Sequence, residues 1–215
     1  MNGYFITATG TDIGKTFCTA GLLRARPGLK AIKPLLSGYV PSEASDSSLL
    51  LEAMGREVTE ATIKDITPWR YAAPLSPDMA AKREGQEIAY EDLLTFCQTA
   101  LEGSPDGLLV EGAGGAAVPL TKTKLTADWI TDLALPVLLV SGTYLGSISH
   151  CLTTAEFLLK RGVLIKAILL NESLTAPVPI QETKAALERY LPCQILPVKR
   201  NATTTDFSVV SRELF

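Results

Sequence analysis

The residues best suited to chemistry in this sequence are Gly14-Lys15-Thr16. They close the segment Thr9–Thr16, which follows the apolar run Tyr4–Thr7 and leads into a helical pattern. A turn between a strand and a helix points backbone N–H groups at phosphate oxygens, and the helix dipole adds to the attraction. The lysine of such a loop reaches the terminal phosphates, and the threonine hydroxyl binds magnesium. We therefore expect the chain to bind a nucleoside triphosphate.

This phosphate loop departs from the usual pattern at its start. Thr9 stands where the first glycine is expected, and Gly10 is the neighbouring residue that supplies backbone freedom. The alternative is an ordinary glycine-containing turn with a solvated lysine. The apolar run before the loop and the helical pattern after it favour phosphate binding.

Three further polar residues could serve the same chemistry. Glu111 ends an apolar run and precedes Gly112–Gly115, and a carboxylate at the end of a buried strand is a suitable magnesium ligand. Asp46 is either a second magnesium ligand or the N-cap of a helix. Lys33 either stabilises charge on a transferring phosphoryl group or is simply solvated. Local sequence leaves both alternatives open.

The elements that must position these residues alternate along the chain. Short, continuous apolar runs are typical of strands buried on both faces, and they occur at Tyr4–Thr7, Ala31–Pro34, Gly107–Glu111, Pro136–Ser141, Leu164–Leu170 and Gln194–Val198. Helical patterns lie between them, at Lys15–Arg24, Asp46–Met54, Tyr90–Leu101, Thr126–Leu133, Ser147–Arg161 and Ile180–Leu191. This alternation predicts a single-domain α/β fold over residues 1–215, with three α/β/α layers and a mostly parallel sheet, similar to the P-loop NTPases.

Two segments lack such patterns. The proline-rich stretch Thr62–Pro77 is expected to be a long ordered loop, and the tail after Pro197 is expected to be loosely held. Ligands of such folds bind at the carboxyl ends of the strands. The segments expected to ring that edge are Thr9–Thr16, Lys33–Gly38, Glu111–Gly115, Ser141–Gly146 and Asn171.

Composition excludes several classes of protein. The chain has 215 residues, is 47% hydrophobic and carries a formal charge of −3, so it offers no basic field for nucleic acid. Its longest apolar stretches, such as Leu135–Val140, are too short to span a membrane. The chain enters a strand at once, which predicts no signal peptide. Its four cysteines are far apart, as expected for a cytoplasmic protein with reduced thiols.

The sequence resembles the dethiobiotin synthases, ATP-dependent carboxylating cyclo-ligases, over nearly its whole length. The resemblance rests on several motifs that are specific in combination: Thr9–Thr16, Ile32-Lys33-Pro34, Ser37-Gly38, Asp46, Tyr71–Pro77, Val110–Gly115, Ala127-Asp128-Trp129, Leu145–His150 and Asn171. It makes Lys33 and Asp46 functional candidates. It also implies the substrates 7,8-diaminopelargonate and CO2, with ATP and Mg2+ as cofactors. One amine captures CO2 as a carbamate, ATP phosphorylates the carbamate, and the second amine closes a ureido ring.

The resemblance also implies roles for individual residues. Lys15 and Lys33 would neutralise charge on the γ-phosphate and the carbamate, and Thr11 and Ser37 would orient phosphate and substrate. The implied magnesium ligands are Thr16, Asp46 and Glu111. The implied nucleotide contacts are Asp12, Ile13, Gly14, Lys15, Thr16, Phe17, Asp46, Glu111, Gly112, Ala113 and Gly114, with Asn171 at the adenine edge and Leu196, Pro197 and Val198 around the base.

In this family the substrate carboxylate is held by a loop of the partner subunit, so a homodimer with a shared active site is implied. The corresponding residues are Leu145, Gly146, Ser147, Ile148 and Ser149. Backbone N–H groups at a helix start are suited to a carboxylate. The single histidine, His150, follows this loop and is expected to be a surface or packing residue.

Some residues depart from the family pattern. Ala8 stands where many members have glycine, and Asp12 stands where glutamate is common. Ser149 replaces a frequent asparagine, and Glu172 replaces a common aspartate. The stretch Gln194–Arg200 lacks the usual Gly-Glu before its Ile-Pro equivalent, so we expect looser recognition of the base.

Two other functions are also consistent with a phosphate loop. A nucleotide switch of the partitioning-ATPase type uses a further lysine early in the phosphate loop, and Ala8–Ile13 contains none. A related ATP-dependent amide ligase, such as one acting on a corrinoid, carries a glutamine-hydrolysing domain, for which the residues after Leu191 are too few. Both classes are therefore less favoured than the cyclo-ligase.

Overall fold

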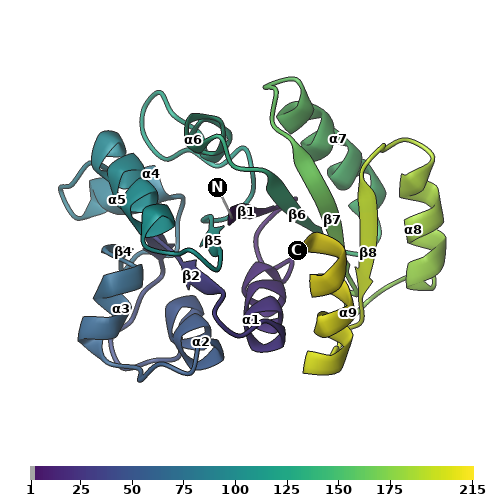
Figure 1. The fold of residues 1–215 in the computed structure, drawn as a ribbon. Coiled ribbons are helices and arrows are strands. Elements are labelled where there is room, and N and C mark those ends of the chain that lie inside the picture. The colour runs from purple at the N-terminus through teal and green to yellow at the C-terminus, as the bar shows by residue number, and fades with distance from the viewer. Residues whose placement is uncertain (1–2) are drawn as a thin grey trace.

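The computed structural model describes residues 3–215, and within them a six-stranded parallel sheet forms the centre of the fold (Figure 1). The strand order is β2-β5-β1-β6-β7-β8. The strands are β1 (Gly3–Ala8), β2 (Lys30–Ile32), β5 (Leu108–Glu111), β6 (Val137–Ser141), β7 (Ile165–Asn171) and β8 (Gln194–Val198). A separate parallel pair is formed by β3 (Leu35–Ser37) and β4 (Trp69–Tyr71).

Helices cover both faces of the sheet, which confirms the predicted three-layer α/β fold. The helices are α1 (Lys15–Ala25), α2 (Asp46–Ala53), α3 (Glu60–Ile66), α4 (Pro77–Arg83), α5 (Tyr90–Glu102), α6 (Thr126–Leu133), α7 (Ser147–Leu159), α8 (Ile180–Glu188) and α9 (Thr204–Leu214). Helices α1 and α9 lie together on one side of the sheet, whereas α6 and α7 lie on the other (Figure 1). Because both faces are covered, every residue of β5 and β6 is buried.

The parallel arrangement brings distant segments to one edge. Strand β1 pairs with β5 so that Ile6 lies opposite Glu111, and β2 pairs with the other side of β5 so that Ile32 lies opposite Val110. The phosphate loop leaves β1 at this edge, and Lys33 leaves β2 there as well. The carboxyl ends of the three strands thus meet at one place, as the sequence predicted. No helix within residues 3–215 is long and apolar enough to cross a membrane.

The expectation of a long loop at Thr62–Pro77 was wrong. This stretch contains the end of α3 and the strand β4, and Pro77 is the first residue of α4. The strand has only three residues, and its partner β3 lies more than thirty positions earlier, at Leu35–Ser37. Such a short strand has too few residues for a periodic pattern, so its pairing could not be recognised locally.

The expectation of a loosely held tail was also wrong, because the tail forms helix α9. Thr203 caps it by accepting a hydrogen bond from the backbone of Asp206 at 3.4 Å. Phe207, Val210 and Leu214 form an apolar stripe at helical spacing and are all buried. The stripe is narrow and the residues around it are mostly polar, which explains why the helical pattern of apolar residues is weak in the sequence.

Helix α9 packs closely against α1. A Cβ atom placed on Gly21 would lie 2.2 Å from the Phe207 ring, so the two helices approach each other only because position 21 carries no side chain. The same ring packs edge-to-face against Phe17, with 5.6 Å between centroids. The C-terminal helix therefore supports the helix that begins in the phosphate loop.

We predict that Gly21→Ala lowers the free energy of unfolding by about 1–3 kcal/mol, the usual cost of overpacking, although alanine is the better helix former. In a Phe207→Ala background the same substitution should be neutral or stabilising, because the clash is gone. Urea denaturation of the four proteins measures both effects. Gly103→Ala is the matched control, since a Cβ there lies 3.5 Å from the nearest atom. Equal costs of Gly21→Ala in the two backgrounds would contradict the packing argument.

Candidate active site

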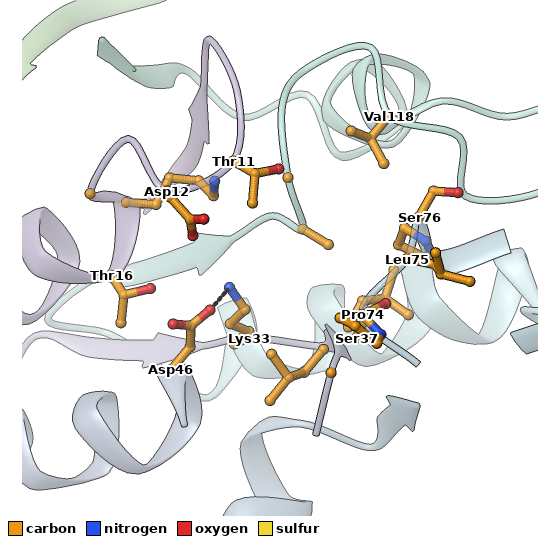
Figure 2. Close-up of a pocket in the computed structure, with 18 of the residues that line it drawn as sticks. Thr11, Asp12, Thr16, Lys33, Ser37, Asp46, Pro74, Leu75, Ser76 and Val118 are labelled. Atoms are coloured by element: carbon orange, nitrogen blue, oxygen red, sulfur yellow. Dashed lines mark ion pairs between the residues drawn. The ribbon is translucent and has the colours of Figure 1, made fainter. Parts of the chain in front are cut away.

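A pocket of about 820 Å³ lies at the carboxyl edge of the sheet (Figure 2). Its walls come from the phosphate loop, the residues after β2, strand β3, the segment before α4 and the loop after β5. The lining residues are Thr11, Asp12, Gly14, Lys15, Thr16, Phe17, Lys33, Leu35, Leu36, Ser37, Gly38, Asp46, Pro74, Leu75, Ser76, Pro77, Ala113, Gly114 and Val118. Figure 2 shows Thr11 and Asp12 on one side of this space and Ser37 with Pro74–Ser76 on the other.

Gly14 gives the phosphate loop its conformation. Its φ of 100° is in the left-handed region, which favours glycine. A Cβ atom at this position would lie 2.2 Å from Nδ2 of Asn171, so a side chain is excluded by contact as well. Helix α1 begins at the next residue, Lys15, with its first N–H groups at the pocket. The loop thus has the backbone that anion binding requires.

Lys15 lies at the base of this loop and is only 7% exposed. Its Nζ donates to the carbonyl of Gly10 at 3.2 Å. The pKa of Lys15 is lowered from its ordinary value of 10.5 to about 8, chiefly by burial and also by the nearby positive charge of Lys33. A buried ammonium without a carboxylate in direct contact is well suited to a polyanionic ligand.

Lys33 forms the centre of an ion cluster that is buried except at Asp46, whose side chain is 38% exposed. The Nζ of Lys33 lies 2.8 Å from Glu111 Oε1. It lies 2.6 Å from Asp46 Oδ2, the ion pair that Figure 2 marks. Lys33 is 3% exposed, and Glu111 is fully buried. Burial acts to lower the pKa of Lys33, but the two carboxylates outweigh it and raise the pKa above its ordinary value. The ammonium therefore stays charged throughout the physiological range.

The structure excludes one of the two roles that the sequence left open for Asp46, that of the N-cap, and the magnesium role stays a prediction. Helix α2 is capped by Ser45, whose side chain accepts a hydrogen bond from the backbone of Ser48 at 3.2 Å. Asp46 is the first helical residue, and its carboxylate contacts Lys33 instead. Burial would raise the pKa of Asp46, but the Lys33 ammonium outweighs burial and holds that pKa below its usual value.

Thr16 completes a set of oxygen atoms around this cluster. Its Oγ1 donates to Glu111 Oε1 at 2.7 Å. Thr16 and Asp46 line the pocket, whereas Glu111 is fully buried and contacts Thr16 and Lys33. The hydroxyl and the two carboxylates thus lie together around the Lys33 ammonium. Mg2+ prefers oxygen ligands and is bound through one or two carboxylates in nucleotide sites. The residues present therefore fit a magnesium ion.

Other residues singled out in the sequence lie in or beside the pocket. Thr11, Phe17, Ala113 and Gly114 line it. Ser37 lines it as well, and within residues 3–215 its buried Oγ has no hydrogen-bond partner. A buried polar atom without a partner is costly, so this hydroxyl is suited to a ligand.

Asn171 lies at the end of β7, behind the phosphate loop. Its Nδ2 donates to the carbonyl of Ile13 at 2.9 Å, so both residues belong to the wall of the loop rather than to the lining of the pocket. The Oδ1 atom of Asn171 is buried and has no partner among the described residues. The amide is thus fixed with its acceptor oxygen unused.

The remaining candidates do not line this pocket. Gly112 packs beneath it, since a Cβ there would lie 2.9 Å from the Phe5 ring. Leu196 and Val198 are buried in β8, and Pro197 between them is half-buried. The loop before α7 and the start of that helix are not part of the pocket lining either, and Leu145 there is 86% exposed. These residues are Leu145, Gly146, Ser147, Ile148 and Ser149.

The structure also brings in residues for which the sequence suggested no role. Thr19 is fully buried, and its Oγ1 lies 2.6 Å from Glu111 Oε2. Thr19 follows Thr16 by three residues, which places both side chains on one face of α1. This spacing is a sequence signal from which Thr19 could have been predicted to lie near the site. Val118 and the segment Pro74–Pro77 form the wall opposite the phosphate loop. Val118 had no local signal, and Pro74–Pro77 belonged to the motif Tyr71–Pro77 without a role of its own, because both contributions depend on tertiary structure.

The parallel sheet, the strand-to-helix loop around Gly14-Lys15-Thr16 and the carboxylate at the end of β5 define a P-loop nucleotide-binding protein. A family profile described as an AAA domain matches residues 2–199. An ATP-dependent dethiobiotin synthetase BioD of Acidiphilium cryptum is 46% identical over 205 residues, which cover 92% of each chain. One of Methylobacterium nodulans is 44% identical over 213 residues, covering 93% of this chain and 94% of the relative. The chain belongs to the ATP-dependent dethiobiotin synthetase family.

Solved structures show the same fold at much lower identity. MinD in the MinC:MinD cell division complex of Aquifex aeolicus has a TM-score of 0.55 and 16% identity, covering 99% of this chain and 86% of that chain. A ParA family ATPase of Chlorobium tepidum has a TM-score of 0.53 and 13% identity, covering 99% of this chain and 93% of that chain. At such identities the likeness concerns the fold alone.

The lowered pKa of Lys15 leads to a prediction about pH. Because the pKa of Lys15 in the free protein is lowered to about 8, and bound phosphates favour the charged form, affinity for ATP without the diamine should be constant below about pH 7 and fall by up to about tenfold per unit above pH 8. Binding above pH 8 should also take up a proton. Isothermal titration calorimetry in buffers of different ionisation enthalpy measures both. Affinity that stays constant to about pH 9.5, as for an ordinary lysine, would contradict the assignment.

Proposed function

We propose that this chain catalyses the ATP-dependent synthesis of dethiobiotin from 7,8-diaminopelargonate and CO2. One amine of the substrate attacks CO2 and loses a proton, which gives a carbamate. The carbamate oxygen attacks the γ-phosphorus of ATP and forms a carbamic-phosphoric anhydride, with release of ADP. The second amine then attacks the carbamate carbon, phosphate leaves, and the ureido ring closes. The 46% identity to a relative named ATP-dependent dethiobiotin synthetase supports this reaction.

The geometric observation that carries the proposal is the meeting of Lys33, Asp46 and Glu111 beside the phosphate loop. A reaction between a carbamate and a triphosphate brings several negative charges together, and the protein must neutralise and position them. The pocket offers two buried ammonium groups for this purpose, those of Lys15 and Lys33. Fixed charges in a site of low dielectric stabilise such a transition state more strongly than water does.

The two lysines have different roles in this proposal. Lys15, at the start of α1 and without a carboxylate in contact, holds the γ-phosphate. Lys33 is held in place by its carboxylate partners and stabilises the charge that moves from the carbamate to the phosphate. Thr11 orients the phosphate, and the unpaired hydroxyl of Ser37 orients the substrate from the opposite wall. Proximity and orientation of this kind contribute several kcal/mol to a rate enhancement, with about 7–11 kcal/mol as the upper range.

The oxygen atoms of Thr16, Asp46 and Glu111 would hold Mg2+. When bound, the ion supplies positive charge to the β- and γ-phosphate oxygens. The protein contributes the fixed positions of its three oxygen ligands. The Thr16 hydroxyl is held by its hydrogen bond to Glu111, and the two carboxylates are held by their ion pairs with Lys33.

The nucleotide would lie along the phosphate loop. Its phosphates contact Asp12–Phe17 and the backbone at Gly112–Gly114, and its base extends toward Asn171. Because Nδ2 of Asn171 is used by Ile13, the remaining Oδ1 accepts a hydrogen bond, which matches the amino group of adenine. The half-buried residue Pro197, between Leu196 and Val198 of β8, would contact the base.

The substrate carboxylate would be bound across a homodimer. Leu145 and Ile148 are apolar but exposed at the start of α7, as expected of a surface covered by a second copy. The first N–H groups of α7, from Ser147 to Ser149, would bind the carboxylate of the substrate held by the other subunit. We further propose that residues 1–215 act as one catalytic domain in the cytoplasm.

The fold likeness to MinD and ParA makes a nucleotide switch the second candidate. Phosphate release with ATP and bicarbonate, measured with and without the diamine, separates the two functions. The cyclo-ligase should release phosphate only when the diamine is present and should form dethiobiotin in equal amount. Release that ignores the diamine would favour the switch.

Lys33→Ala should reduce dethiobiotin formation by at least about a hundredfold, because it removes a cation from the phosphoryl-transfer site. Lys122→Ala is the control, since the Lys122 side chain is 85% exposed and pairs with the exposed Glu87. The measurement is product formation at saturating ATP, with thermal unfolding to verify that each variant is folded. Near-normal turnover by Lys33→Ala would remove this residue from the mechanism.

A mixture of two inactive variants tests the shared site. Lys33→Ala disables the pocket, and Ser149→Glu places a carboxylate where the substrate carboxylate should bind. When subunits of a symmetric dimer mix at random, about half of the dimers contain one copy of each variant. Each mixed dimer has one complete site out of two, so the mixture should regain about a quarter of the normal activity. Light scattering verifies the mass of each sample. If the mixture stays inactive while both variants are dimeric, the carboxylate loop does not act across subunits.

A further inference from the structure

The two oxygen atoms of Glu111 have different partners. Oε1 accepts hydrogen bonds from Thr16 at 2.7 Å and from Lys33 at 2.8 Å, and both of these partners line the pocket. Oε2 accepts a hydrogen bond from Thr19 Oγ1 at 2.6 Å. Thr19 is fully buried and does not line the pocket. This hydroxyl therefore reaches the reacting groups only through Glu111.

The local structure of α1 explains this contact. Thr19 lies three residues after Thr16, so both hydroxyls lie on the face of the helix that packs against β5. The Thr19 hydroxyl also lies 2.9 Å from the carbonyl of Lys15, but it carries one hydrogen. The carboxylate oxygen is nearer and charged, so it is the stronger acceptor.

We propose that Thr19 is a positioning residue, whose hydroxyl fixes the Glu111 carboxylate so that Oε1 is presented to Mg2+ and to Lys33. A β-branched side chain in a helix has few rotamers, and full burial restricts this one further. With both oxygen atoms bonded, the carboxylate cannot rotate. Ligands oriented in this way by outer hydrogen bonds lose affinity for their metal when the bond is removed. The inference rests on the proposed role of Glu111 in holding Mg2+.

A purely structural role has different consequences. A buried carboxylate needs hydrogen bonds to offset the loss of solvation, and a hydroxyl that only met this need would affect the stability of the fold. It would not change how strongly nucleotide binding depends on Mg2+. The dependence on Mg2+ therefore distinguishes positioning from general stabilisation.

The experiment compares Thr19→Val, which removes the hydroxyl but keeps the shape, with Thr19→Ser, which keeps the hydroxyl. ADP binding is measured by isothermal titration calorimetry in excess Mg2+ and again in excess EDTA. We expect Thr19→Val to weaken ADP binding in Mg2+ by about 10–100-fold and to leave the affinity in EDTA nearly unchanged. Thr19→Ser should bind ADP as the unmodified protein does under both conditions.

Thr183→Val is the matched control, because Thr183 is a buried threonine of α8, a helix that contributes nothing to the pocket. Unchanged affinity of Thr19→Val in Mg2+, or an equal loss in EDTA, would overturn the proposal. If Thr19→Val does not fold, Thr19→Ala replaces it, and equal affinities of the alanine and serine variants would overturn the proposal in the same way. An unmodified protein that binds ADP with Mg2+ but makes no dethiobiotin would refute the enzymatic function and leave the Thr19 comparison intact.

Discussion

The ion pair of Lys33 with Asp46 and Glu111 is the interaction on which the rest of the site depends. Burying an ammonium group is unfavourable unless carboxylates and hydrogen bonds compensate for its lost hydration. Here the partners come from the residue after β2, the start of α2 and the end of β5, so the cluster forms only when these elements are correctly placed. Removing one partner would leave an uncompensated charge in the interior. The cluster thus ties the chemistry of the pocket to the assembly of the sheet.

The sheet and its main helices could be predicted from the sequence because their apolar runs reflect burial on both faces. The predicted limits of β8 and α6 agree with the structure, at Gln194–Val198 and Thr126–Leu133. The pair of β3 and β4 and the helix α9 were missed for a different reason. The strands β3 and β4 are short, and α9 is mostly polar. All three are stabilised by partners distant in sequence: β3 and β4 by each other, and α9 by the packing of Phe207 on Gly21. Local patterns carry no information about such partners.

The candidate site was predictable to the extent that its residues follow strands. Lys33 comes directly after β2, and Glu111 is the last residue of β5. Because ligands of such folds bind at the carboxyl ends of the strands, this rule was sufficient to predict that the two residues lie together. Asp46 was ambiguous, because an acidic residue beside serines is equally typical of a helix cap, and only the structure shows that Ser45 caps α2. Thr19 was missed because a threonine within a helix has an ordinary structural explanation.

The packing of α9 on α1 has a consequence for the order in which contacts form during folding. The residue that covers Gly21 and Phe17 is Phe207, which lies far from both in the sequence. Tyr4 likewise donates to the carbonyl of Leu214 at 2.5 Å. The first strand and the first helix therefore keep apolar surface uncovered until this distant segment packs on them. Contacts between such distant segments form slowly, because the entropy of closing a long loop opposes them.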